Sequence, residues 1–128
     1  MKESSEAARW YQKAIHDEGM AEFGISGGQE YADSVCFHCQ QSAEKNIKGL
    51  LIWFSIFFPR THSLQLLLNL ASKCVHVPDV IWQAAEKLEP YSVAIRYPSD
   101  DPDPSFDEAI EAVECMKVIR FWVTSLSE

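Results

Sequence analysis

Apolar side chains recur at helical spacing through one long segment, and this pattern constrains the fold more than any other feature of the sequence. Between residues 32 and 58 they return every three or four positions, which is the period of an amphipathic helix. The stripe consists of Ala32, Val35, Cys36, Cys39, Ala43, Ile47, Leu50, Leu51, Phe54 and Phe57. We expect one helix of about 28 residues, about 42 Å long. It should end at Pro59, because proline disfavours a helical conformation in the residue before it.

Four other segments show the same period, and none alternates with period two for long enough to form a strand. The first spans Ser5 to about Glu22 and is followed by glycines between residues 24 and 28. A short helix begins after Thr61–Ser63, a further one begins at Pro78 and is interrupted at Pro90, and the last opens with the capping box Ser105–Glu108. The inward positions that we expect in these three are Leu64, Leu67, Leu68, Ala71 and Val75; Ile81, Ala84, Ala85, Leu88, Tyr91 and Ile95; and Ala109, Val113, Met116, Ile119, Val123 and Leu126.

The length of the chain fits one domain over residues 1–128. Helices of these lengths, joined by short connections, predict an all-α fold. We expect an antiparallel up-and-down four-helix bundle with an additional short helix.

Charge is plentiful but unevenly placed. The chain has 11 Lys and Arg residues against 19 Asp and Glu residues, which gives a net charge of −8. This balance argues against general nucleic-acid binding, which needs a basic surface to neutralise phosphates. The segment from residue 45 to residue 78 nevertheless contains four basic residues and no acidic one. A local site for one phosphate-bearing ligand therefore remains open, although solvated helix faces of differing sign explain the pattern equally well.

No segment is long and apolar enough to cross a bilayer. The longest apolar run, residues 50–58, is short against the roughly 20 residues that a spanning helix needs. The sequence also opens without the basic and apolar regions of a signal peptide. We therefore expect a soluble, cytoplasmic protein with no membrane partner.

The four cysteines are expected to be reduced, because the chain has no secretory signal. Cys36 and Cys39 lie on the apolar stripe, where cysteine behaves as a small hydrophobe. A zinc site completed by Cys74 and His76 is the less favoured alternative, because that second pair is poorly spaced. We expect no metal and no cofactor. The tryptophans, which fall on or beside apolar stripes, are interpreted as core or interface residues: Trp10, Trp53, Trp82 and Trp122.

Three stretches together resemble the HEPN family, the higher eukaryotes and prokaryotes nucleotide-binding domain. Residues 36–51 (CFHCQQSAEKNIKGLL) resemble its signature, with Glu-Lys after a small residue and a further Lys before Leu-Leu. Pro59–Leu64 resembles the family's Thr-His-Asp-Leu stretch with serine in place of aspartate, and Arg96–Pro98 resembles its Arg-Tyr-Pro close. The resemblance implies a four-helix bundle that forms a homodimer and is often encoded beside a small nucleotidyltransferase.

Many HEPN proteins are metal-independent ribonucleases that use an R-x4-6-H motif, and this chain departs from that motif. After Arg96, the window in which the histidine should stand reads Asp101, Pro102 and Asp103. Arg9 and His16 fit the motif by count, but they lie in the first helix, where we interpret the match as chance. We therefore assign no catalytic residue and favour a protein that is not an enzyme.

The resemblance and the basic residues suggest a ligand site for a nucleotide or phosphate at Lys48, His62, Arg96 and Tyr97. Each charged residue also has an ordinary structural explanation. Arg96 could cap helix carbonyls, His62 could cap the helix that follows it, and Lys48 could pair with Glu44 one helical turn away.

Three functional hypotheses follow. The first is a dimeric HEPN-type binding module that assists a small nucleotidyltransferase and binds a nucleotide. The alternative is a divergent, metal-independent HEPN ribonuclease of the toxin–antitoxin kind, and the third is a purely structural dimerisation domain. Dimerisation itself is also expected because residues 50–58 are apolar nearly all round, and a second chain would cover the excess.

Overall fold

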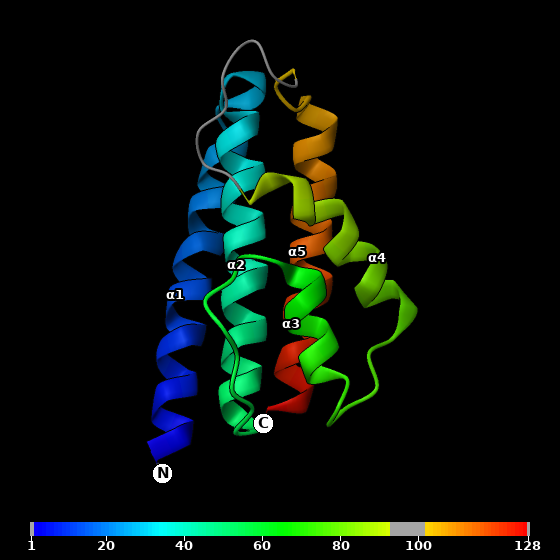
Figure 1. Cartoon of the computed structure of the whole chain (residues 1–128). Helices are drawn as coiled ribbons and strands as arrows, with labels where there is room; N and C mark the ends of the chain where they lie inside the picture. Colours follow the sequence, from blue (N-terminus) through cyan, green and yellow to red (C-terminus); the bar gives the residue numbers. More distant parts are fainter. Residues whose placement is uncertain (1, 93–101, 128) are drawn as a thin grey trace.

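The computed structural model describes residues 2–92 and 102–127, and every regular element within them is helical. The elements are α1 (Lys2–Ile25), η1 (Gly28–Tyr31), α2 (Ala32–Trp53), α3 (Leu64–Ala71), α4 (Asp79–Leu88), η2 (Glu89–Tyr91) and α5 (Phe106–Leu126), of which η1 and η2 are 3₁₀ turns. Figure 1 shows α1, α2, α4 and α5 alternating in direction, with the short α3 beside α2 and α5. The expected antiparallel four-helix bundle with an additional short helix is confirmed.

The core lies between α2, α3, α4 and α5, and α1 packs along α2. Most of the predicted inward positions of α3, α4 and α5 are buried, because the helical period places them on one face. Val75, Tyr91, Val113 and Leu126 are only partly buried and pack against this core. Ile95 lies outside the described residues. Trp82 and Trp122 also pack against the core, as expected.

Small residues on α1 allow that helix to approach α2 closely. Ala7, Ala14 and Ala21 are buried at seven-residue intervals along α1. On the facing helix, a Cβ added at Gly49 would lie only 2.5 Å from Cε1 of Tyr11. The pair is therefore held at a separation that a larger side chain at Gly49 would not permit.

Helix α2 is shorter than expected. The apolar stripe predicted a helix that continues to Pro59. The helix stops at Trp53, because Ser55 adopts a left-handed conformation with φ of 59°. The Ser55 amide donates to the Ile52 carbonyl at 3.0 Å, and the Ile56 amide donates to the Leu51 carbonyl at 2.8 Å. These are the two hydrogen bonds of a Schellman motif, which satisfies the last carbonyls of a helix.

The other predicted boundaries are close to those observed. The α5 capping box is present, with the Ser105 side chain and the Glu108 side chain each bonded to the other residue's backbone. Helix α4 ends at Leu88, and Pro90 lies in the 3₁₀ turn that follows. Helix α1 is longer than expected and runs to Ile25. Within the described ranges, no helix combines the length and apolar character that spanning a membrane requires.

Candidate functional site

A buried carboxylate, that of Glu44, joins two of the four predicted ligand residues. Its Oε2 accepts a hydrogen bond from Lys48 Nζ at 2.9 Å, and its Oε1 lies 3.1 Å from Nδ1 of His62. The Gln40 amide donates to Oε1 of Glu44 at 3.2 Å and to the His62 carbonyl oxygen at 3.1 Å. Glu44 is only 3% exposed, so its carboxylate lies in the interior of the bundle, with Gln40 and Lys48 buried beside it and His62 at the surface.

Lys48 is fully engaged by its surroundings. The residue is 7% exposed, and its ammonium lies 5.5 Å from the ring centre of Trp10 and 5.8 Å from that of Phe58. The two rings meet edge to face, with their centres 6.2 Å apart. The predicted ion pair with Glu44 is confirmed, and the Lys48 charge is balanced within the fold.

His62 is exposed, and the helix that follows it is capped by other residues. Ser63 is the N-cap of α3 and accepts from the Leu66 amide. The Glu89 carboxylate accepts from the amides of Leu64 at 2.8 Å and Gln65 at 3.1 Å. The start of α3 is therefore already occupied by a carboxylate, which leaves fewer backbone amides for a phosphate to bind there. The other two predicted ligand residues, Arg96 and Tyr97, lie outside the described residues.

A second buried carboxylate, that of Asp17 on α1, was missed by the sequence analysis. Its Oδ1 lies 2.8 Å from Nδ1 of His38, and its Oδ2 accepts from Nζ of Lys45. Both partners come from α2, so the cluster ties the two helices together. A signal was present in the sequence, because Asp17 continues the small-residue stripe of Ala14 and Ala21, where a charged side chain must be paired.

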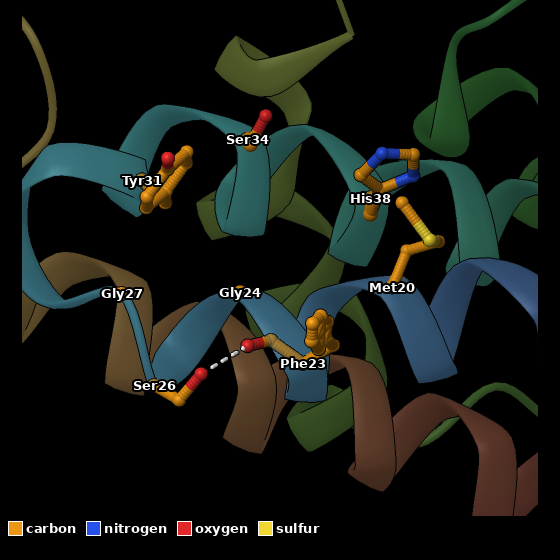
Figure 2. A pocket seen from close by; sticks show the side chains of 8 residues that line it. All are labelled: Met20, Phe23, Gly24, Ser26, Gly27, Tyr31, Ser34 and His38. Carbon is orange, nitrogen blue, oxygen red and sulfur yellow. Dashed lines mark hydrogen bonds between the residues drawn. The ribbon is translucent and has the colours of Figure 1, made fainter.

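His38 also borders a cavity of about 420 Å³ between the end of α1 and the start of α2 (Figure 2). The cavity is lined by Met20, Phe23, Gly24, Ser26, Gly27, Tyr31, Ser34 and His38. The Ser26 hydroxyl donates to the Phe23 carbonyl at 2.8 Å, which fixes the turn below the cavity. A Cβ at Gly27 would meet the Tyr31 ring at 2.1 Å, so glycine lets that ring lie against the turn.

The cysteines behave as buried apolar residues, with one exception. Cys36 and Cys39 are buried, as predicted, and so is Cys115, whereas Cys74 is exposed. Among residues 2–92 and 102–127 no group of three or more His, Cys, Asp or Glu side chains is arranged to hold a metal ion.

The thiols should accordingly differ in reactivity. Burial raises the pKa of the Cys39 thiol and that of Cys115, so less thiolate is present at any given pH and both react more slowly. We expect one fast-reacting thiol in the folded protein, and this reaction should be absent in Cys74→Ser. In denaturant all four thiols should react. A chromogenic disulfide reagent measures both counts. A second thiol that reacts at the rate of Cys74 would contradict this assignment.

The family model described as HEPN domain matches residues 7–126. The structure of ST0689, an archaeal HEPN homologue, shares 29% identity, with 95% of this chain and 98% of that chain covered and a TM-score of 0.75. TT1696 from Thermus thermophilus shares 28% identity, with 94% and 97% covered and a TM-score of 0.83. The HEPN domain protein tm0613 from Thermotoga maritima, at 21% identity, covers 92% and 96% with a TM-score of 0.74 and shows the fold alone. No curated protein matches the chain.

Proposed function

The chain belongs to the HEPN domain family, and from this premise we propose that it is a helical binding module that works as a homodimer. Its partner is a small nucleotidyltransferase and its ligand a nucleotide, as the sequence resemblance implies. One observation supports the homodimer, namely an aromatic surface left uncovered at the end of α2.

This surface consists of Trp53 and Phe57. After the left-handed Ser55 the chain alternates, with Ile56 and Phe58 packed against the core and Phe57 turned outward. Phe57 is 90% exposed, and Trp53 at the last position of α2 is also exposed. Burying an aromatic side chain removes roughly 150–250 Å² of surface from contact with water. A second copy that covers these rings would therefore stabilise the dimer through the hydrophobic effect.

The ribonuclease alternative has weaker support. The ammonium of Lys48 and the carboxylate of Glu44 are bonded to each other rather than directed at a substrate. The sequence after Arg96 also offers aspartate and proline where the family's ribonucleases have histidine. A general acid–base group typically contributes about 10²–10⁴-fold to a rate, so its loss favours binding over catalysis.

Substituting Phe57 by serine should convert the dimer to a monomer. Light scattering of the unmodified protein at micromolar concentration should give twice the chain mass of 14.6 kDa, and Phe57→Ser should give that mass itself. Phe121→Ser is the matched control, because Phe121 is 68% exposed and belongs to α5 rather than to the end of α2. An unmodified protein that scatters as a single chain would refute the proposed assembly.

A further inference from the structure

We propose that the outer seam between α1 and α2 binds a ligand with a flat aromatic ring at one end and phosphate groups at the other. The outer seam is defined here by Arg9, Lys13, His16 and Phe23 on α1 and by His38 and Lys45 on α2. The inference rests on the proposed function and deepens it, since it gives the nucleotide a site that the sequence analysis did not consider.

Three hollows follow one another along α1, and two of them also have lining residues on α2. The cavity of Figure 2 lies at the end of α1, a hollow of about 470 Å³ lies around His16 and Lys45, and one of about 240 Å³ lies around Arg9. Lys13 lines both of the last two. The four α1 residues are separated by four, three and seven positions, which places them on one helix face. The 14 residues from Arg9 to Phe23 rise by about 21 Å.

One end of the seam suits an aromatic ring. Met20, Phe23 and Tyr31 stay exposed around the cavity, although each is large and apolar. Figure 2 shows the His38 ring at the same cavity. Because Nδ1 of His38 is bonded to Asp17, its Nε2 is left to bond a heteroatom of a ring stacked on Phe23.

The other end suits phosphate. Arg9 and Lys13 are exposed, and neither forms an ion pair with any described residue. Glu6 is the acidic residue that lines the hollow at Arg9, whereas the hollow at His16 has Lys13 and Lys45 and no acidic lining residue. The charge of Lys45 is already balanced by Asp17, so in a chain with a net charge of −8 it is Arg9 and Lys13 that are left to attract an anion.

Asp17 connects the two ends. Its buried carboxylate bonds His38, which borders the aromatic cavity, and Lys45, which lines the cationic hollow. Both side chains are thereby held in place before a ligand arrives, and such preorganisation lowers the entropic cost of binding.

A nucleoside polyphosphate combines the two chemistries that the seam offers. A simple phosphate would leave the aromatic end unused, and an apolar molecule would leave the cations without an anion. ATP is therefore the probe, with adenosine and inorganic triphosphate as its separate halves.

Calorimetry should show that ATP binds more tightly than either half, and that added salt weakens binding. Lys13→Ala should weaken ATP binding about tenfold, through loss of a charge-assisted contact. Phe23→Ala should weaken it about fivefold, through loss of ring stacking. The matched controls are Lys73→Ala, an exposed lysine after α3, and Phe121→Ala, whose exposure of 68% is close to the 70% of Phe23. Both controls should bind as the unmodified protein does.

Several outcomes would overturn the inference. No binding at millimolar ATP would exclude the site. If ATP and inorganic triphosphate bind with equal affinity, the aromatic end contributes nothing to binding. Loss of binding in Arg96→Ala but not in Lys13→Ala would place the ligand at the sequence-predicted residues instead. A single-stranded RNA that binds far more tightly than ATP would replace the free nucleotide as the ligand. Light scattering tests the dimer separately, so a failed seam and a failed assembly are distinguishable.

Discussion

Replacing Glu44 by alanine should destabilise the fold by about 3–5 kcal/mol, because it leaves the Lys48 ammonium buried without its anion. Lys48 is almost fully buried, and its donor contact with Glu44 is 2.9 Å long. The rings of Trp10 and Phe58 attract the cation but supply no negative charge to replace the carboxylate. The loss should appear as a lower urea midpoint at an unchanged slope.

Two comparisons separate the ion pair from other effects of this substitution. Glu86→Ala, at an exposed position on α4, should change the free energy of unfolding by less than about 0.5 kcal/mol. The double substitution Glu44→Leu with Lys48→Met removes both charges and should be far less destabilising than Glu44→Ala alone, since apolar replacements of a buried pair are often neutral. If Glu44→Ala unfolds at the same urea concentration as Glu86→Ala, Lys48 does not depend on this carboxylate.

The helices were predictable because most of them bury one face, and a single-face pattern shows directly in the spacing of apolar residues. The end of α2 was not, because the segment FSIFF at residues 54–58 fits two periods at once. Phe54 and Phe57 continue the helical stripe, whereas Ile56 and Phe58 are the residues that the extended chain turns inward. The choice between them depends on the left-handed Ser55, and serine carries no strong preference for that conformation.

The site was predictable only where its contacts are local. Glu44 and Lys48 lie one helical turn apart, so their ion pair can be inferred from spacing alone. The bond from Asp17 to His38 depends on how α1 and α2 are aligned, and the bond from Glu89 to the Leu64 amide joins residues 25 positions apart. Helical periodicity gives the face of a residue but not its partner on another helix, so neither bond could be read from the sequence.

Gly49→Ala should destabilise the protein by about 1–3 kcal/mol, although the same change stabilises an ordinary helix. Gly49 lies inside α2, where alanine is favoured over glycine by roughly 1 kcal/mol. The added Cβ, however, would stand 2.5 Å and 2.8 Å from two carbons of the Tyr11 ring and 3.2 Å from Cβ of Trp10. The Tyr11 ring packs against the core, so α1 itself must move away from α2 to relieve the contact.

Gly19→Ala is the matched control for this packing effect. Gly19 lies inside α1, and a Cβ at that position meets nothing within 4 Å. Only helix propensity then acts, and Gly19→Ala should stabilise the fold by up to about 1 kcal/mol. Thermal unfolding should therefore shift the two midpoints in opposite directions. If Gly49→Ala also raises the midpoint, α1 does not approach α2 as closely as the contact with Tyr11 requires.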